Sequence, residues 1–307
     1  MFNTVLINVA IILIYMLLGF AAGKGKKALP SHAKSLSGIL IYVLAPAMII
    51  NAFVNMEYSH ESLAKIGIYA GASFVIQFLF MMLLYIIFRR KYSDARYRIL
   101  TIGSTLGNVG FFGMPVLAGI FPTEPIVLCY SSINVVTMNL LVFTMGVFLI
   151  TNDKKYMSLK SAILNPSSLS LLVSIPLFIF KVQLPELLGS PLALLAKMVT
   201  PMCMLILGIR LSAVSLKAIF TRPVVYATCF LKLVVFPFFA LACVMWLPFM
   251  DNTAKLAIFI LAATPSGAII ESLAEFHECE QELSANVVLL TTILCLITMP
   301  IVLLAMS

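Results

Sequence analysis

The chain has 307 residues, of which 62% are hydrophobic and 10% are charged, and its mean hydropathy is +1.10. A soluble domain of this length presents more polar surface to water, so this composition excludes a soluble globular fold. The net charge of +8 does not indicate nucleic-acid binding, because the basic residues lie in short clusters between apolar runs. We therefore expect an integral membrane protein whose surroundings are the lipid bilayer and which binds no nucleic acid.

Ten apolar runs follow one another along the chain, and a membrane span requires about 20 mainly apolar residues. We interpret each run as one transmembrane helix of an all-α polytopic membrane protein, the sixth being short because Pro176 interrupts it. The expected spans are Thr4–Ala22, Leu36–Asn55, Ile66–Phe88, Tyr97–Phe121, Ile126–Ile150, Ser167–Phe180, Leu192–Leu211, Val224–Leu247, Ala254–Ala274 and Leu283–Met306.

Basic residues concentrate in the loops that follow the first, third, fifth and seventh spans. They are Lys24, Lys26, Lys27, Lys34, Arg89, Arg90, Lys91, Arg96, Arg98, Lys154, Lys155, Lys160, Arg210, Lys217 and Arg222. The intervening loops carry few. Since cytoplasmic loops are enriched in Lys and Arg, we expect these loops in the cytoplasm and both chain termini outside.

Matching or similarly polar residues recur at offsets of 155 to 157 positions, which indicates an internal repeat. Pro46 and Pro201 lie 155 residues apart. Two further pairs lie 157 residues apart: Gly110 with Gly267, and Asn134 with Thr291. Five spans per unit is an odd number, so the second unit would be inverted in the membrane relative to the first. We expect one five-helix unit in residues 1–152 and its inverted counterpart in residues 153–307.

The fourth and ninth spans each contain helix breakers near their centre. The fourth carries Gly107, Asn108 and Gly110, and the ninth carries the run from Thr264 to Gly267. A break in hydrocarbon frees backbone groups, and it is tolerated only where it is buried in protein or lines a wet cavity. Two breaks in corresponding halves are the pattern of a transporter's substrate site.

Asn108 and Asn134 are the candidate side chains for substrate binding in the first half. The Asn108 carboxamide offers donors and an acceptor, and the glycines beside it allow close backbone approach. Asn134 lies in the fifth span on one face with Ser131 and Thr137. The alternative for both asparagines is packing, in which they satisfy freed backbone groups or neighbouring helices.

Thr264, Pro265, Ser266 and Gly267 are the candidate substrate-binding residues of the second half. Proline removes one backbone donor and disrupts the preceding helical turn. The half-helix that begins after such a break points its positive end into the membrane, which favours an anion. The alternative is a simple proline kink.

Two ionisable residues, Lys232 and Glu271, fall inside expected spans. A charge at mid-bilayer costs roughly 3 kcal/mol on insertion scales and indicates function. We expect the two to pair, or Glu271 to take up a proton during transport. In the alternative, Lys232 snorkels to the surface and Glu271 faces cytoplasmic water. Arg210 is interpreted as an orientation charge.

The chain offers no pattern for a metal, a cofactor or a catalytic centre. Its six cysteines have no zinc-type spacing, and its three histidines fall in expected loops. It also has no nucleotide-binding loop, so direct drive by ATP is not expected. We expect neither a cofactor nor enzymatic activity.

Two motifs resemble those of the auxin efflux carrier family of bacterial permeases, which is related to the plant PIN-FORMED carriers. Ser104-Thr105-Leu106-Gly107-Asn108 through Met114-Pro115 resembles the first crossover motif of that family, and Pro265-Ser266-Gly267 through Glu275-Phe276 resembles the second. Pro46 and Pro201 match prolines in its scaffold spans. The resemblance covers nearly the whole chain.

This resemblance implies a crossover fold similar to that of sodium–proton antiporters and bile-acid carriers. Spans 1, 2, 6 and 7 would form a scaffold, and spans 3–5 and 8–10 a moving transport unit. By this resemblance Asn108 would contact the substrate carboxylate. From their positions in the spans, Glu271, Lys232, Pro46 and Pro201 are our candidates for coupling or gating. The family also implies a bacterial cytoplasmic membrane, and it includes dimers.

These observations predict a secondary transporter that moves a small organic anion, such as malate or malonate in bacterial relatives, by alternating access. One alternative is a proton- or sodium-coupled carrier of the same fold for a different solute. A membrane-embedded enzyme and a sensor are alternatives from other classes, but they would require clustered catalytic residues or an attached signalling domain.

Overall fold

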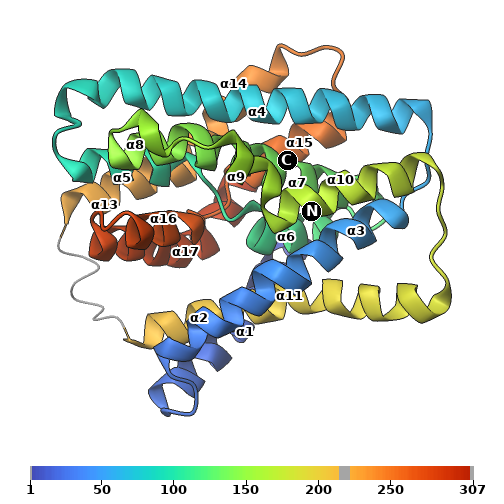
Figure 1. Ribbon diagram of the computed structural model, residues 1–307, viewed down its shortest axis with the longest axis horizontal. Helices are drawn as coiled ribbons and strands as arrows, with labels where there is room; N and C mark the ends of the chain where they lie inside the picture. Colours follow the sequence, from blue (N-terminus) through green and yellow to red (C-terminus); the bar gives the residue numbers. More distant parts are fainter. Residues whose placement is uncertain (1, 214–221, 305–307) are drawn as a thin grey trace.

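The computed structural model describes residues 2–213 and 222–304, and this part of the chain is helical (Figure 1). Its helices are α1 (Phe2–Lys24), α2 (Pro30–Ile39), α3 (Ala45–Val54), α4 (His60–Phe88), α5 (Ala95–Thr105), α6 (Met114–Ile120), α7 (Ile126–Leu141), α8 (Val147–Thr151), α9 (Leu159–Leu164), α10 (Pro166–Ile179), α11 (Glu186–Ala213), α13 (Pro223–Phe230), α14 (Phe236–Met245), α15 (Asn252–Ala262), α16 (Ile269–Phe276) and α17 (Gln281–Leu304). Lys217 and the last residues of the tenth expected span lie outside the described residues.

Short π-helical segments join several of these helices into longer ones. Leu40–Leu44 joins α2 to α3, Val142–Gly146 joins α7 to α8, and Leu231–Val235 joins α13 to α14. Pro46 and Pro237 lie in the first turns of α3 and α14, directly after such segments. A proline lacks the N–H that a continuous α-helix would use at that point, so a local change of helical winding accommodates it.

Seven helices of the described residues are long and apolar enough to cross a membrane. They are Ser31–Val54, His60–Lys91, Ile126–Thr151, Lys154–Ile179, Glu186–Ala213, Pro223–Met245 and Gln281–Val302. Shorter apolar helices, Ala10–Lys24, Val109–Ile120 and Asn252–Ala262, lie in the expected first, fourth and ninth spans. The fourth and ninth are short because each is interrupted near its centre. The chain is thus a multi-pass membrane protein.

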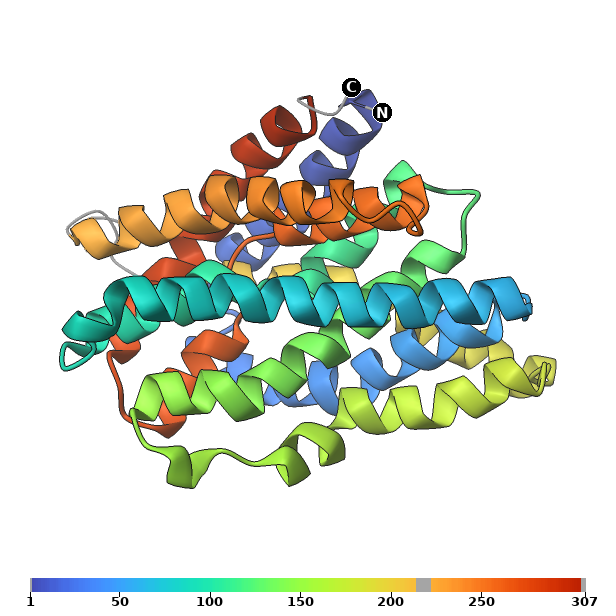
Figure 2. The same cartoon turned by 90° about the horizontal axis from the view of Figure 1, so that it is seen from above.

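The basic loops gather at one end of the molecule. In Figure 1 the long helix α4 crosses the view, and the basic loops that follow α1, α4 and α8 lie toward its left side, as does the acidic loop that follows α16. We call this side the basic end. The loops that follow α3, α6, α10 and α14 lie toward the other end, as the view from above in Figure 2 also shows.

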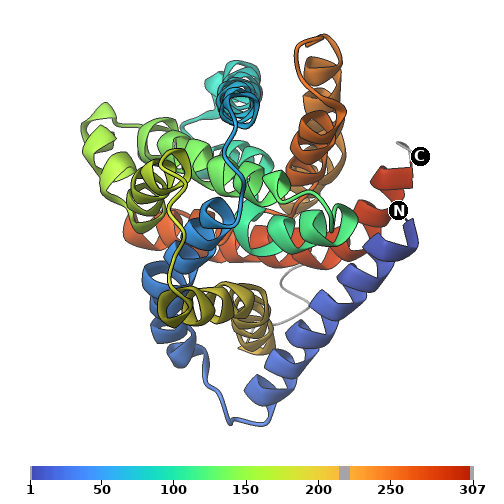
Figure 3. The same cartoon turned by 90° about the vertical axis from the view of Figure 1, so that its right-hand side faces the viewer.

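Helices α1, α2–α3, α10 and α11 pack against one another as one group. In Figure 3, α1 and α11 lie in the lower half of the view and α4 in the upper half. Glycines let α1 and α11 approach closely, since a Cβ added at Gly208 would lie 2.0 Å from the carbonyl oxygen of Met16. Gly19 in α1 faces Leu205 of α11 in the same way. Small residues are the usual means of close helix contact in membranes.

A second group consists of α4, α5–α6, α7–α8, α13–α14, α15–α16 and α17. Phe80 of α4 stacks on Phe236 of α14 with ring centroids 4.7 Å apart, and both rings are buried. Helices α7 and α17 pack beside the interrupted helices α5–α6 and α15–α16. This second group therefore encloses both helix breaks.

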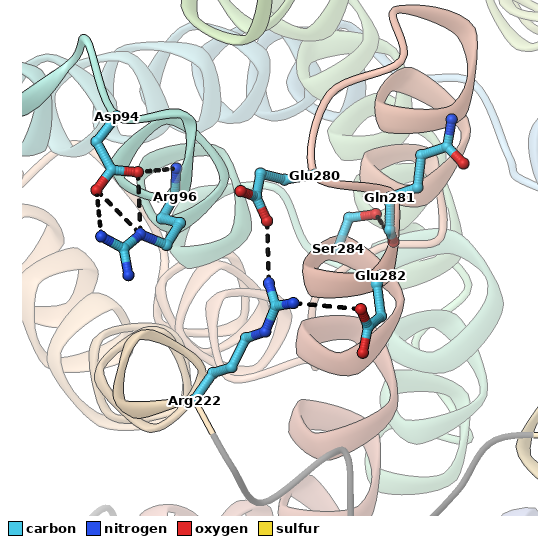
Figure 4. A network of polar contacts seen from close by, with 7 residues as sticks. All are labelled: Asp94, Arg96, Arg222, Glu280, Gln281, Glu282 and Ser284. Carbon is cyan, nitrogen blue, oxygen red and sulfur yellow. Dashed lines mark hydrogen bonds and ion pairs between the residues drawn. The ribbon is translucent and has the colours of Figure 1, made fainter.

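Ion pairs fix the basic end of the second group. Arg222, just before α13, donates to Glu280 and Glu282 at 3.0 and 3.2 Å and so ties the start of α13 to the start of α17 (Figure 4). Asp94 caps α5 by accepting from the backbone N–H of Arg96. Hydrogen bonds from the Arg96 side chain lower the pKa of the Asp94 carboxyl. The side chains in both contacts are partly exposed to water, so each contact adds only modestly to stability.

Candidate functional site

The two interrupted helices cross at their breaks and pair there through backbone hydrogen bonds. The N–H of Asn108 donates to the carbonyl of Pro265 at 2.7 Å, and the N–H of Gly267 donates to the carbonyl of Leu106 at 3.0 Å. Gly107 and Ser266 thus form an antiparallel bridge between two extended segments. Each break supplies partners for the groups that the other leaves free, which makes both breaks stable within the membrane.

Close backbone contact at the crossing requires glycine on both strands. A Cβ added at Gly267 would lie 2.9 Å from the carbonyl oxygen of Gly107. A Cβ added at Gly107 would lie 2.6 Å from Thr264 Oγ1 and 2.9 Å from Lys232 Nζ. The two backbones could not approach this closely if side chains stood between them.

Buried hydroxyl groups form further hydrogen bonds with backbone groups at the breaks. Ser131 of α7 donates to the carbonyl of Val109 at 3.0 Å, and Thr291 of α17 accepts from the N–H of Ser266 at 3.1 Å. Ser266 Oγ in turn donates to the carbonyl of Gly103 at 2.7 Å. These hydroxyl groups are fully buried, so they serve the backbone rather than a substrate.

Lys232 lies beside the crossing and does not snorkel to the surface. Its side chain is fully buried. Its ammonium donates to the carbonyl of Ala262 at 3.0 Å, at the C-terminal end of α15, and lies 4.6 Å from the centroid of the Phe236 ring. A cation is favourable at the negative end of a helix and over an aromatic face. Lys232 forms no ion pair within the part of the chain that the structure describes.

A cavity of about 870 Å³ lies between the crossing and the first helix group. One wall is the crossing itself, with Gly107 to Phe111 and Gly267 to Ile269. The opposite wall comes from α2–α3 and α11. The cavity extends toward the basic end, where the exposed side chain of Lys160 borders it.

The cavity wall is mostly apolar, with a few polar groups placed around it. The polar and charged side chains of the wall include Ser37, Asn108, Asn139, Lys160, Ser161, Asn165, Arg210 and Ser272. Two of these are cationic, and no carboxylate belongs to the wall that the described residues form. Such a wall suits a molecule with an apolar body and a negative group.

The expected site residues separate into two sets in the structure. Gly107, Asn108, Gly110, Gly267 and Pro46 line the cavity. Thr264, Pro265 and Ser266 lie at the crossing but do not border it, and neither Lys232, Glu271 nor Pro201 is part of its wall.

Asn134 does not line this cavity, where the sequence places it with Asn108. Its side-chain oxygen accepts from Ser73 and, at 2.8 Å, from Gln77, both on α4. Thr137 belongs to the same buried cluster, 3.1 Å from the Ser73 hydroxyl. Helix α7 turns Val135 and Met138 toward the cavity instead. The cluster holds α4 against α7, because buried polar groups in a membrane need partners.

The expected pairing of Glu271 with Lys232 is wrong. Glu271 accepts from Arg210 of α11, and the two side chains are 17% and 22% exposed. Arg210 lines the cavity, so it is more than the orientation charge that the sequence indicates. Glu271 lies in the first turn of α16, where the helix dipole favours a negative charge.

Sequence reasoning also missed Cys203, whose buried thiol lines the cavity opposite the crossing. Asn139 and Asn165 line the cavity as well, with the Asn139 amide 3.3 Å from Asn165 Oδ1. Cys203 and Arg210 are seven positions apart on α11 and therefore lie on one helix face. This spacing is the sequence feature from which a shared position of the two residues on α11 could be predicted.

Comparison with known families gives a match over nearly the whole chain. A family described as "Membrane transport protein" matches in two segments, residues 4–159 and 155–303. A comparison with curated proteins finds no match. The two segments cover both helix breaks and the cavity between the helix groups. The chain therefore belongs to this family of membrane transporters, the auxin efflux carrier family.

Proposed function

We propose that the protein is a secondary transporter that moves a small organic anion across the bacterial cytoplasmic membrane by alternating access. The observation that carries this proposal is the cavity between the crossing and the first helix group, whose wall holds Asn108, Arg210 and Lys160 but no carboxylate among the described residues. Cationic groups in a low-dielectric wall attract anions more strongly than they do in water. The positive end of α16 begins at the same wall, beside Gly267 and Ala268.

In this proposal α1, α2–α3, α10 and α11 are the scaffold, and the second helix group is the transport unit. The chain would consist of ten spans in two inverted five-helix units, residues 1–152 and 153–307. The basic end would face the cytoplasm, with both termini outside. Because the cavity extends toward the basic end, this arrangement corresponds to a state open to the cytoplasm. The two prolines of the scaffold, Pro46 and Pro201, would be the points at which its helices adjust.

Asn108 is proposed as the residue of the crossing that contacts the substrate carboxylate. Its backbone is fixed by the bond to Pro265, and its carbonyl accepts from the N–H groups of Phe112 and Gly113. The side chain faces the cavity, where its partner is the Cys203 thiol of α11. A carboxamide N–H can donate to a carboxylate without adding a charge that would have to be desolvated.

Uptake into proteoliposomes tests the transport proposal. Malonate and malate represent short dicarboxylates, and phenylacetate represents a monocarboxylate with an apolar body. Each is measured with and without a pH gradient. Saturable uptake of a carboxylate, competed by its unlabelled form, supports the proposal. Uptake of none of them in functionally reconstituted protein would overturn the assignment of an organic anion.

Replacing Asn108 with alanine should weaken binding of the transported carboxylate by roughly tenfold to a hundredfold, the range expected when a hydrogen bond to a charged group is lost. Binding is measured by the rise in melting temperature that the carboxylate produces in purified protein. Asn286→Ala, which removes a buried carboxamide outside the cavity wall, is the matched control. If Asn108→Ala binds as well as the parent protein, the crossing is not the substrate site.

A further inference from the structure

The Arg210–Glu271 ion pair joins the two helix groups at the wall of the cavity. Arg210 projects from α11 of the first group, and Glu271 from the first turn of α16 in the second. The residues just before α16, Gly267 and Ala268, line the cavity together with Arg210. The pair therefore lies where a molecule in the cavity would meet the positive end of α16.

No other ion pair of the described residues links the two groups. Lys65 pairs with Glu61 and Asp251, and Arg96 pairs with Asp94, all within the second group. Arg222 pairs with Glu280 and Glu282, again within the second group (Figure 4). A charge contact between α11 and α16 is thus a feature of the boundary that alternating access would have to rearrange.

The chemistry of the pair matches that of the proposed cargo. An arginine guanidinium binds carboxylates through parallel N–H donors in a fixed geometry. Glu271 presents a carboxylate to that guanidinium at the edge of a cavity whose described wall has no carboxylate of its own. The other cation of the wall, Lys160, is exposed, so Arg210 is the better shielded of the two and its contacts are less weakened by water.

We propose that Glu271 occupies the carboxylate subsite of Arg210 in the empty carrier, and that the carboxylate of the substrate takes its place on binding. This inference rests on the proposed function, since it assigns the residue that receives the organic anion. Exchange of one carboxylate for another keeps the guanidinium paired throughout, and the displaced Glu271 carboxylate stays in the first turn of α16, where the helix dipole favours a negative charge. The exchange also removes the ion pair between α11 and α16.

Single substitutions of the two partners should change anion binding in opposite directions. Glu271→Gln removes the competing carboxylate, so malonate or phenylacetate should bind about tenfold more tightly, the size of one charged hydrogen bond. Arg210→Gln removes the receiving group, and binding should weaken about a hundredfold. The double variant should bind as weakly as Arg210→Gln. Affinities are measured on the purified full-length protein at constant pH and salt.

Matched controls separate this effect from a general change of charge. Glu275→Gln removes an exposed carboxylate one turn further along α16, and Arg90→Gln removes an exposed cation at the basic end. Both should leave the affinity within about twofold of the parent, because exposed charges contribute little. If Arg210→Gln does not fold, Arg210→Lys replaces it; it keeps the charge without the paired donors and should bind about tenfold more weakly.

A purely structural ion pair would give a different pattern. Both single variants would then bind the carboxylate no better than the parent, and both would have a lower melting temperature. The double variant would regain the melting temperature of the parent. That pattern, or an unchanged affinity in Glu271→Gln, would overturn the exchange while leaving the proposed transport of carboxylates intact. If neither the parent nor Glu271→Gln binds either carboxylate, the exchange and the anion assignment fail together.

Discussion

Replacing Gly208 with alanine should separate α1 from α11 and leave little folded protein. The added Cβ would lie 2.0 Å from the carbonyl oxygen of Met16 and 2.7 Å from the backbone nitrogen of Phe20. Both are backbone atoms, so no rotamer change relieves the contact, and α1 itself has to move. Overpacking of a well-packed core costs about 1–3 kcal/mol and sometimes more. We expect the upper part of this range, seen as a large fall in melting temperature and yield.

Gly71→Ala is the matched control for this prediction. An added Cβ at Gly71 of α4 meets no atom within 4 Å, and alanine favours a helix over glycine by up to about 1 kcal/mol. This variant should melt at the same temperature as the parent or slightly above it. If Gly208→Ala proves as stable as Gly71→Ala, the close packing of α1 on α11 is not present in the membrane.

Replacing Gly267 with alanine should abolish most transport while leaving the outer helices assembled. Its Cβ would lie 2.9 Å from the carbonyl oxygen of Gly107 and so would push the two crossing backbones apart. The hydrogen bonds that join Gly267 to Leu106 and Asn108 to Pro265 would then lengthen. A buried group left without its partner costs about 1–3 kcal/mol. We expect uptake of the transported carboxylate to fall roughly tenfold or more.

Uptake and melting temperature are measured together for Gly267→Ala, with Gly67→Ala as the control. Gly67 belongs to the same helix group, and an added Cβ there meets no atom within 4 Å. A loss of uptake larger than the loss of stability would identify the crossing as part of the transport site. Normal uptake by Gly267→Ala would show that close contact of the two backbones is not required.

The helix breaks could be predicted from sequence because their cause is local. Pro265 removes a backbone donor, and Gly107 and Gly267 permit conformations that end a helix. The residues that form hydrogen bonds with the freed backbone groups are harder to predict from sequence. Ser131 and Thr291 lie on other helices, and the sequence places them on a face without saying what that face contacts. The side of α7 that faces the cavity was therefore assigned to Asn134, which packs against α4 instead.

The charges inside the spans were assigned least well. Lys232 was expected to reach either Glu271 or the surface, but the end of α15 provides a carbonyl for it deep in the protein. Arg210 was counted among the orientation charges because loop statistics cannot show which charges turn inward. One missed signal was local: Gly19 and Gly23 form a small-xxx-small pattern in α1, and this face of α1 packs on α11.

The buried ammonium of Lys232 bears on how membrane voltage would act on the carrier. It is held by the end of α15, so it travels with the crossing whenever the transport unit moves relative to the scaffold. Moving one elementary charge across 100 mV changes the free energy by about 2.3 kcal/mol. While Lys232 is protonated, its positive charge cancels much of the charge displaced with a monocarboxylate, whereas a dicarboxylate would leave an excess. Because the lysine returns with the empty carrier, the net charge moved per cycle would report the valence of the cargo and of any coupled ion, whereas the voltage dependence of the loaded step would also include the lysine charge.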